Sequence, residues 1–316
     1  RQPQIFLPGR RNPYRGTRRR LATGPRERVD VPVICVGNLN AGGTGKTPTV
    51  IALAQMLADR GIAAHAVTRG YGGTQAGPLR VAEQRHSAAQ VGDEALLLAA
   101  FLPTWVAEDR AAGARAAVDA GAACILLDDG FQNAALAYDL SLVIVDAWRG
   151  FGNGNVIPAG PLREPISAGI SRADLLLSIG PEAAQARFST AWGDRVVIPR
   201  LQGALVPLPT GLPLSGMRVI AFAGIGHPEK FFQTLKSMGT TIISTHALAD
   251  HQPLSDALMT RLLREAREKM AQVVTTEKDA VRLKPALRSQ VMTLPVRLVI
   301  NDSVALDSAL DRAVAQ

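Results

Sequence analysis

Aromatic side chains and cysteines are both scarce in this sequence. Phe, Trp and Tyr together make up 4% of the 316 residues, which argues against the stacking surfaces that bind single-stranded nucleic acid. The two cysteines, Cys35 and Cys124, each lie within an apolar run. Two such thiols give no disulfide framework, so we expect both to be buried core residues in a protein of a reducing compartment.

Long hydrophobic runs are also missing. The longest nearly continuous apolar stretch, residues 95–107, is interrupted by Pro103 and is too short to span a bilayer. The chain nevertheless has 47% hydrophobic and 20% charged residues, which is the composition of a globular protein. At roughly 150 residues per domain, its length predicts about two domains.

Acidic residues are almost absent from the first 28 positions. This segment has nine arginines and a single acid, Glu27, so it accounts for the whole net charge of +8. Because prolines and glycines interrupt it, we expect residues 1–30 to form a basic arm that is disordered in isolation. Such an arm is attracted to anionic lipid by about 1 kcal/mol per basic residue near the surface. The neutral remainder offers no basic groove, so we predict no nucleic-acid partner.

Apolar, β-branched runs alternate with alanine- and leucine-rich runs through most of the chain. This alternation is typical of βαβ units, which build a mostly parallel sheet with helices on both faces. In the first part, the predicted strands are residues 31–36, 62–67, 104–107, 123–127, 140–145 and 173–178, and the predicted helices are residues 46–60, 91–101 and 109–120.

A proline-rich stretch at 206–216 is predicted to be a linker. It separates an α/β domain at 31–205 from a second, smaller α/β domain at 217–316. The predicted strands of the second domain are residues 217–222, 241–244 and 272–275, and its predicted helices are residues 228–237, 254–270 and 303–315.

The stretch NLNAGGTGKTP, residues 38–48, follows the first predicted strand and precedes the first predicted helix. This is the setting of a phosphate-binding loop, in which glycines turn backbone amides toward an anion at a helix N-terminus. Lys46 would reach the β- and γ-phosphates of a nucleotide, and the Thr47 hydroxyl would bind Mg²⁺. Asn40 stands where the usual pattern has its first glycine, and because asparagine can take the left-handed conformation that this glycine usually supplies, the departure is tolerable. The predicted nucleotide site consists of Asn40, Ala41, Gly42, Gly43, Thr44, Gly45, Lys46 and Thr47.

A second element agrees with this site. Residues 124–130, CILLDDG, are an apolar run that ends in Asp128 and Asp129. A buried strand would deliver these acids to the edge of the sheet beside the phosphate loop, where either could hold Mg²⁺ directly or through water. The sequence leaves open which of the two contacts the metal.

Three further polar clusters stand out. Arg69 and Tyr71 follow the second predicted strand in TRGYGG, and Asp93 and Glu94 begin a predicted helix in VGDEALLL. The two acids are equally well explained as N-terminal helix caps. The glycine- and proline-rich stretch 150–165 is a loop of the length that usually has a function.

Eight segments together resemble the tetraacyldisaccharide 4'-kinase family, the lipid A 4'-kinases. In chain order they are VICVGNLNAGGTGKTPTV, TRGYGG, VGDEALLLA, ILLDDGFQN, GFGNGNVIPAGPLREP, AFAGIGHPEKFF, ADHQPLS and VTTEKDAVRL. They run from residue 33 to residue 283. The resemblance therefore covers nearly the whole chain.

The resemblance implies a kinase that transfers the γ-phosphate of ATP, with Mg²⁺, to the 4'-hydroxyl of a tetraacylated glucosamine disaccharide 1-phosphate in lipid A synthesis. It implies a P-loop kinase domain and a smaller domain that closes over the active-site cleft. The expected location is the cytoplasmic face of the bacterial inner membrane, with peripheral attachment to an anionic membrane surface and no obligate protein partner.

The resemblance also implies roles for individual positions. Asp93 is the expected base, His251 is expected to orient it, and Lys46 is expected to act on the phosphates. Expected metal contacts are Thr47, Asp128, Asp129 and Glu94, and expected substrate contacts are Arg69, Tyr71, Arg110, Asn155, Arg163 and Glu164.

The sequence departs from the family in two places. Members usually begin with an apolar or amphipathic helix, whereas residues 1–30 are rich in arginine, and the common DHH reads Asp250-His251-Gln252 here. The main alternative function is a regulatory nucleotide-switch ATPase or GTPase of the deviant-Walker class, but its signature lysine would stand at Ala41. A dinucleotide enzyme built on residues 224–226, GIG, lacks the third glycine of the fingerprint.

Overall fold

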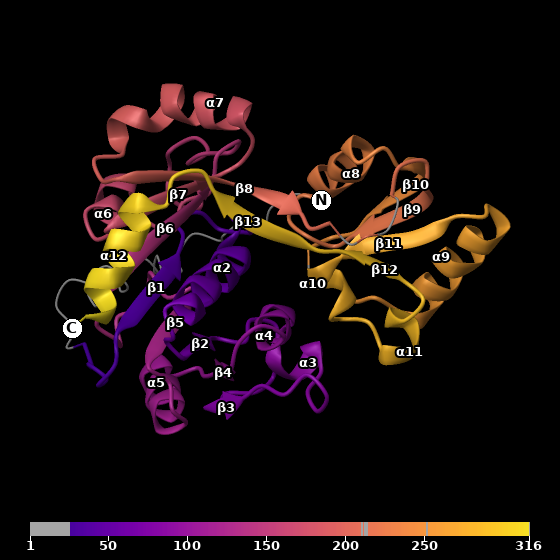
Figure 1. Ribbon diagram of the computed structural model, residues 1–316. Coiled ribbons are helices and arrows are strands. Elements are labelled where there is room, and N and C mark those ends of the chain that lie inside the picture. Colours follow the sequence, from indigo (N-terminus) through magenta and orange to yellow (C-terminus); the bar gives the residue numbers. More distant parts are fainter. Residues whose placement is uncertain (1–25, 210, 212–213, 251, 316) are drawn as a thin grey trace.

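The protein is described from a computed structural model, which covers residues 26–209, 211, 214–250 and 252–315. These residues form two lobes, each built around its own sheet (Figure 1). Most of the predicted basic arm, residues 1–25, lies outside the described residues. The predicted fold class, a mostly parallel α/β sheet with a second, smaller α/β unit, is confirmed.

The larger lobe contains a nine-stranded sheet in the order β13-β8-β7-β6-β1-β5-β2-β4-β3. Its strands run parallel except at the two edges, where β13 pairs antiparallel with β8 and β3 pairs antiparallel with β4. The strands are β1 Val33–Gly37, β2 Ala64–Thr68, β3 Leu79–Arg80, β4 Thr104–Val106, β5 Cys124–Asp128, β6 Leu140–Asp146, β7 Leu175–Ile179, β8 Arg200–Pro207 and β13 Val296–Ile300.

Helices cover both faces of this sheet. Helices α2 (Lys46–Asp59) and α12 (Val304–Val314) share one core with it, and α5 (Arg110–Asp119), α6 (Ile166–Ile170) and α7 (Glu182–Trp192) share the other. Every residue of β1, β2, β5, β6 and β7 is buried. Burial on both faces explains why these strands are nearly continuous apolar runs in the sequence.

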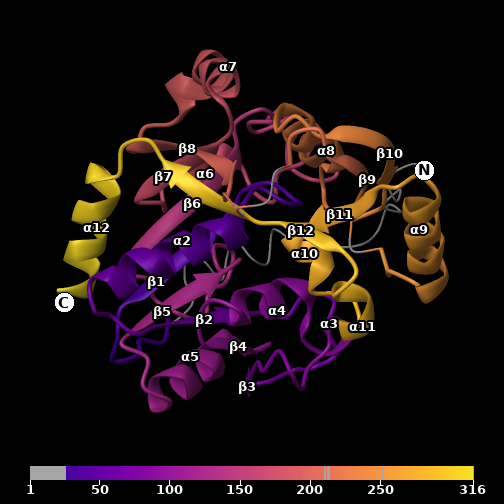
Figure 2. The same ribbon diagram turned by 45° about the vertical axis from the view of Figure 1, so that its right-hand side comes forward.

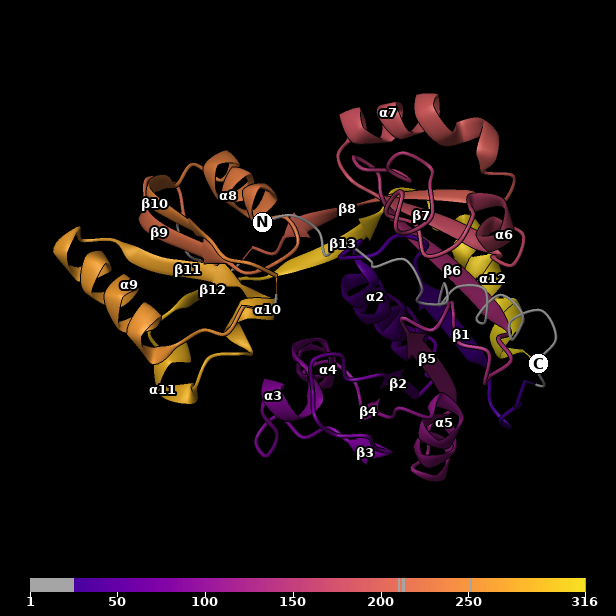
Figure 3. The ribbon, with the colours of Figure 1, turned by 180° about the vertical axis from the view of Figure 1, so that it is seen from behind.

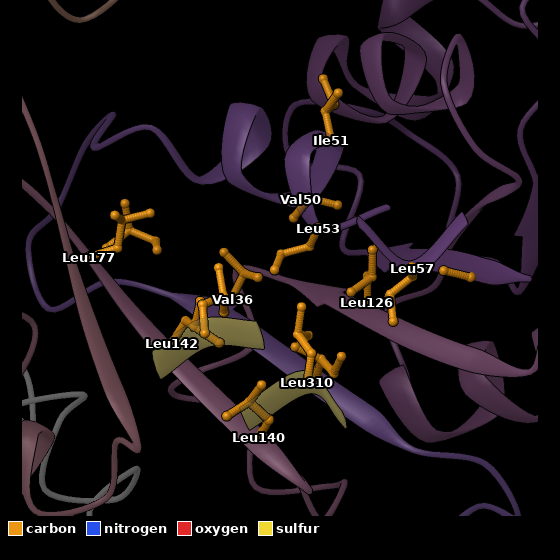
Figure 4. Packing of buried hydrophobic residues seen from close by; sticks show 14 of the residues in the cluster. Val36, Val50, Ile51, Leu53, Leu57, Leu126, Leu140, Leu142, Leu177 and Leu310 are labelled. Atoms are coloured by element: carbon orange, nitrogen blue, oxygen red, sulfur yellow. The ribbon is translucent and has the colours of Figure 1, made fainter. Parts of the chain in front are cut away.

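Helix α2 is anchored to the sheet by leucines one turn apart. Leu53 and Leu57 are completely or almost completely buried and face Val36 and Leu126 of the central strands (Figure 4). Each such side chain contributes roughly 1.5–3 kcal/mol by leaving water. This packing fixes the N-terminus of α2, and with it the loop before it, over the carboxyl ends of β1 and β5.

A glycine divides one of the predicted helices. Residues 91–101 were expected to be continuous, but the chain forms α3 (Ala88–Val91) and then α4 (Asp93–Ala99). Gly92, between them, has φ +88, and a Cβ there would lie 2.6 Å from the carbonyl oxygen of Tyr71. The break therefore starts a new helix at Asp93, directly beside the loop that follows β2.

The smaller lobe contains a parallel four-stranded sheet in the order β10-β9-β11-β12. Helix α8 (Pro228–Ser237) packs on one face through Phe231 and Leu235, and α9 (Asp256–Glu268) packs on the other through Met259 and Leu262. The remaining elements of this lobe are β9 Arg218–Ala223, β10 Thr241–Ala247, β11 Gln272–Thr276, β12 Met292–Leu294, α10 Glu277–Ala280 and α11 Pro285–Arg288.

The division between the lobes differs from the predicted ranges of 31–205 and 217–316. Strand β13 pairs with β8, with Leu298 opposite Leu205, and α12 contributes Leu306 and Leu310 to the core of the larger lobe. The chain therefore leaves the larger lobe on β8 and returns to it on β13 (Figures 1 and 3). The sequence did not identify β13 as a strand, and a local apolar pattern identifies a helix but not the sheet that it joins. The predicted range 217–316 therefore placed the helix at 303–315 in the wrong lobe.

Strand β8 continues through Pro207, so the predicted linker at 206–216 begins within a strand. Both cysteines are buried in central strands, Cys35 in β1 and Cys124 in β5. Across the described part of the chain, no helix combines the length and the apolar character needed to cross a membrane.

Candidate active site

The glycine-rich loop joins β1 to α2 at the centre of the larger sheet. Gly42 and Gly45 have φ near +100, a conformation that favours glycine. The amide of Asn38 braces the loop from within, because its Nδ2 donates to the Gly42 carbonyl oxygen at 3.1 Å and to Thr44 Oγ1 at 3.0 Å. The loop thus opens directly into a helix N-terminus, which is an anion-binding arrangement.

Asn40 does not use the left-handed conformation that its residue type permits. Among the described non-glycine residues, only Asp129 and Met270 have positive φ. Asn40 instead forms a bridge with Leu162, and its buried Nδ2 donates to the Gly150 carbonyl oxygen at 3.1 Å. An extended residue pinned to the 150–165 loop therefore replaces the first glycine of the usual pattern.

Lys46 opens α2 and is almost completely buried. Its Nζ lies 3.6 Å from Asp129 Oδ1, and Arg163 donates to both oxygens of the same carboxylate, at 2.8 and 3.3 Å. Burial alone would raise the pKa of Asp129, but the charges of Lys46 and Arg163 outweigh it and hold that pKa below its usual value. Asp129 is therefore a carboxylate that is ionised and held by two cations.

Asp128 has the opposite environment, although it is the next residue along the chain. It is completely buried at the end of β5, and burial, reinforced by the negative charge of Glu94, raises its pKa to about 7. Thr68 Oγ1 donates to its Oδ2 at 3.2 Å, whereas its Oδ1 has no hydrogen-bond partner. A buried, ionised carboxylate oxygen without a hydrogen-bond partner lowers the stability of the folded protein unless a proton or a cation binds to it.

These residues fit a divalent metal that arrives with a nucleotide rather than one held by the protein alone. In the described ranges, no three His, Cys, Asp or Glu side chains are grouped to hold a metal ion. Mg²⁺ commonly uses one or two carboxylates together with substrate phosphates and water. The unpartnered Asp128 Oδ1, beside a phosphate loop, is a donor of that kind.

Asp93 and Glu94 begin α4 and face the smaller lobe. Asp93 is buried, and its Oδ1 accepts a hydrogen bond from the Glu94 amide at 2.9 Å. Across the junction, Lys278 Nζ lies 3.2 Å from Glu94 Oε1, and Arg282 Nε lies 4.0 Å from Asp93 Oδ2. Helix α10, which carries Lys278, lies against α4 (Figure 2). The two lobes therefore meet at the predicted base.

A second network connects the 150–165 loop to the loop after β5. Gln132 Nε2 donates to Glu164 at 3.0 Å, and its Oε1 accepts from Arg163 at 3.1 Å. Arg172 contacts both oxygens of Glu164, at 2.7 and 2.6 Å. Glu164 is thus neutralised within the larger lobe, and Arg163 is oriented toward Asp129.

The other predicted substrate residues are more dispersed. Arg110, at the start of α5, is buried close enough to Asp128 and Asp129 for their charges to oppose the lowering of its pKa by burial. Tyr71 is 69% exposed. Arg69 is also exposed and is 3.9 Å from Glu108, and Asn155 is exposed in the 150–165 loop. His251, the predicted partner of Asp93, lies outside the described residues.

The glycines of the smaller lobe do not form a dinucleotide site. The Gly224 amide donates to both oxygens of the buried Asp279, at 3.1 Å each. A Cβ at Gly226 would lie 3.9 Å from the Gly43 nitrogen. The GIGHP turn therefore approaches the phosphate loop from the opposite lobe and leaves little room between them.

A cavity of about 450 Å³ lies beside the phosphate loop. Ala41, Gly43 and Thr44 form one wall, and the polar end of β6 forms another. The latter wall contains Trp148, whose ring is covered by Arg187 at 5.2 Å. The volume is within the usual range for small-molecule sites.

Several residues at the site were not singled out from the sequence: Asn38, Gln132, Asp250, Lys278 and Arg282. All five lie inside segments that carry the family resemblance, so the motifs were visible. Their roles were not, because each depends on a contact with a distant part of the chain. For example, Lys278 Nζ also lies 3.8 Å from Asp250.

Comparisons with known proteins agree with this geometry. The model of the tetraacyldisaccharide-1-P 4'-kinase family matches residues 12–315. A tetraacyldisaccharide 4'-kinase of Jannaschia sp. is 70% identical over 95% of this chain and 92% of its own length. One from Dinoroseobacter shibae is 66% identical over 93% of this chain and 88% of its own length.

A solved structure gives the same picture. LpxK from Aquifex aeolicus, crystallised with ATP, superposes with a TM-score of 0.71 at 27% identity and covers 92% of this chain and 90% of its own. Sequence and structure thus agree over nearly the full length. The chain belongs to the tetraacyldisaccharide-1-P 4'-kinase family.

Proposed function

We propose that this chain transfers the γ-phosphate of ATP to the 4'-hydroxyl of a tetraacyldisaccharide 1-phosphate, the phosphorylation step of lipid A synthesis. One observation carries the proposal. The phosphate loop, with Lys46 beside Asp129, faces the carboxylates of α4 at the junction of the two lobes. The chain that carries this arrangement is 70% identical to a protein named tetraacyldisaccharide 4'-kinase.

The larger lobe supplies the nucleotide site. The backbone of residues 40–47 and Lys46 hold the phosphates, and the 450 Å³ cavity takes the part of ATP that extends from them. Thr47, Asp128, Asp129 and Glu94 would hold Mg²⁺, either directly or through water. When bound, the metal neutralises charge on the transferred phosphoryl group. The lysine and the backbone amides orient that group before reaction.

Asp93 is the base in this proposal. A sugar hydroxyl is a weak nucleophile, and a positioned carboxylate accepts its proton as phosphoryl transfer proceeds. Asp93 is suited to this because its Oδ1 is fixed by the Glu94 amide. His251 orients Asp93 in this scheme. Arg69, Tyr71 and Asn155, exposed near the cleft, bind the lipid headgroup, while Arg110, Arg163 and Glu164 organise the acids beneath it.

The enzyme acts peripherally at the cytoplasmic face of the inner membrane, attached through its arginine-rich arm and without an obligate protein partner. The concentration of net charge in the first 28 residues supports this. Without residues 1–25, the protein should sediment less with anionic vesicles, and added salt should weaken the binding of the full chain. Equal sedimentation of both proteins at low salt would contradict the role of the arm.

The activity itself is tested with labelled ATP and a purified lipid A disaccharide 1-phosphate acceptor. A labelled lipid product is expected, and omission of the acceptor should leave almost all of the ATP intact. Hydrolysis of ATP at the same rate with or without acceptor would contradict the kinase and favour the nucleotide-switch alternative.

A further inference from the structure

Arg282 lies where the two lobes meet, two residues after α10 ends. Its side chain is 8% exposed, so the guanidinium is almost fully enclosed. Nη1 donates to the Gln252 carbonyl oxygen at 3.0 Å, and Nη2 donates to the Gly224 carbonyl oxygen at 3.4 Å and contacts the Asp279 carboxylate. Both terminal nitrogens are therefore bound within the smaller lobe.

The remaining nitrogen faces the larger lobe. Arg282 Nε is buried, has no hydrogen-bond partner, and lies 4.0 Å from Asp93 Oδ2. That separation is an ion pair but is too long for a hydrogen bond. A buried charged group that lacks a hydrogen bond destabilises the structure. A small closing movement of the lobes would therefore be favourable, because it would form the hydrogen bond from Arg282 Nε to Asp93 Oδ2.

The smaller lobe is shaped to hold the guanidinium still. A Cβ at Gly224 would lie 2.8 Å from Arg282 Nη2, so glycine at that position leaves room for the side chain. Asp279, completely buried, is in turn fixed by the Gly224 amide and by Thr276 Oγ1 at 2.7 Å. A planar guanidinium held on two sides in this way presents its third donor in a fixed direction.

We propose that Arg282 is a positioning residue for phosphoryl transfer, which orients the Asp93 carboxylate from the smaller lobe and so links alignment of the base to closure of the two lobes. The same guanidinium fixes the backbone of Gln252, the residue after His251 in the sequence. Asp93 is then held on both oxygens, by the Glu94 amide and by Arg282. The inference rests on the proposed role of Asp93 as the base.

A double-mutant cycle with Arg282→Lys and Asp93→Ala tests the coupling. Lysine keeps the positive charge near Asp279 but cannot reach Gln252, Gly224 and Asp93 at once. We expect Arg282→Lys to lower kcat about tenfold, which corresponds to ~1.4 kcal/mol, and to change the KM for ATP less than about twofold. In the Asp93→Ala background the same substitution should change kcat less than about twofold, because residues that act together are not additive.

Two further variants separate positioning from folding. Gly224→Ala crowds the guanidinium of Arg282 without removing its charge. It should therefore lower kcat, as Arg282→Lys does, and should have little effect on kcat in the Asp93→Ala background. Lys230→Met is the matched control, because Lys230 also contacts the larger lobe, at Asp146, but at a different point. Lys230→Met should change kcat by the same factor in the wild-type and Asp93→Ala backgrounds. Thermal melting of each variant verifies that it is folded.

The outcomes distinguish this inference from the proposed function. If Asp93→Ala costs little activity, the base assignment is wrong and the inference is overturned with it. If Asp93→Ala is severely impaired but Arg282→Lys has the same effect in both backgrounds, only the role of Arg282 is overturned. A rise in the KM for ATP at unchanged kcat would likewise refute it, since that would indicate a role in nucleotide binding.

Discussion

The two lobes face each other through ion pairs of mainly one polarity. In Glu94–Lys278, Asp93–Arg282 and Asp146–Lys230 the larger lobe contributes the carboxylate and the smaller lobe the cation. The pair Arg297–Glu277, where β13 meets α10, has the reverse polarity. The lobes also differ in burial. The central strands β1, β5 and β6 of the larger sheet are entirely buried, whereas the central strands β9 and β11 of the smaller sheet each include at least one residue that is exposed or only partly buried. In the function proposed above, the larger lobe would perform the chemistry and the smaller lobe would align it.

The largest effect should come from the phosphate loop of the larger lobe. Lys46→Ala should reduce kcat by roughly 10³–10⁵, the range for losing a cation that stabilises the transferred phosphoryl group. The fold should persist because Asp129 keeps its contacts with Arg163. Single-turnover kinetics measure the loss of rate, and a thermal melt shows whether the fold persists. Near-normal turnover in a folded Lys46→Ala protein would remove the loop from the mechanism.

The next effect should come from the meeting point of the lobes. Asp93→Ala should lower kcat by roughly 10²–10⁴, as expected for a lost general base. His251→Ala should cost less, and the double mutant should resemble Asp93→Ala alone, because the pair acts as a unit. Steady-state rates of the three variants provide the measurement. Fully additive losses would mean that the two residues act independently.

The cavity beside the loop should affect binding rather than rate. Trp148→Ala should raise the KM for ATP about fivefold at unchanged kcat, the lower end of what a stacked base contributes. Trp192, which packs on Phe151 and is not among the residues that line that cavity, offers the control Trp192→Phe, for which the KM for ATP should stay unchanged. An unaltered KM for ATP in Trp148→Ala would mean that ATP does not bind against Trp148 in this cavity.

The contrast between neighbouring carboxylates predicts a pH dependence of stability. Asp128 has a pKa raised to about 7, whereas an unfolded carboxyl titrates near ~3.9. The folded state therefore binds a proton that the unfolded state has lost, and stability falls as pH rises through this window. In metal- and nucleotide-free protein, the Tm of Asp128→Asn should decline less than that of the wild type between about pH 4 and 7.

Asp129→Asn is the natural control for that experiment, because the pKa of Asp129 is lowered rather than raised. Because the charge of Asp129 raises the pKa of Asp128 less than burial does, Asp129→Asn should flatten the decline of Tm much less than Asp128→Asn does. If Asp128→Asn and the wild type lose stability in parallel across the window, Asp128 is not protonated in the folded protein.

The smallest effect should come from the third pair between the lobes. Lys230 is nearly half exposed, with 47% of its side chain in solvent, and solvent-exposed ion pairs contribute about 0–1 kcal/mol. Asp146 Oδ1 would still accept from the Trp148 amide at 2.9 Å. Lys230→Met should therefore destabilise the protein by less than about 1 kcal/mol in urea unfolding. A loss of several kcal/mol would mean that this pair, rather than strands β8 and β13, holds the lobes together.

Much of the larger lobe could be predicted from the sequence because its information is local. Apolar runs such as 124–128 are strands buried on both faces, and the GKT motif spans the start of α2, with Gly45 as its N-cap and Lys46 as its first residue. The position of α12 was not predictable in the same way. Its apolar stripe, which includes Leu306 and Leu310, would suit either sheet, and only the pairing of β13 with β8 decides between them.

The site was predictable to the same extent. The acids and the lysine belong to motifs with a recognisable spacing, so Lys46, Asp93 and Asp128 could be proposed from the sequence. Arg282 was not found, because its significance arises from a distance to Asp93 across two lobes. Asn40 shows a further limit: its residue type permits the left-handed conformation, but a tertiary contact with Gly150 selects another.

The paired strands β8 and β13 also constrain the order of events on the ribosome. Strand β8 emerges before the entire smaller lobe, and its antiparallel partner emerges only after it. During synthesis, therefore, the smaller lobe is complete while the larger sheet still has an unpaired edge and an uncovered core face that awaits α12. Domains generally fold as units as they emerge. In this protein the smaller lobe can complete its folding before the larger lobe, whose sheet and core are completed only when β13 and α12 have been synthesised.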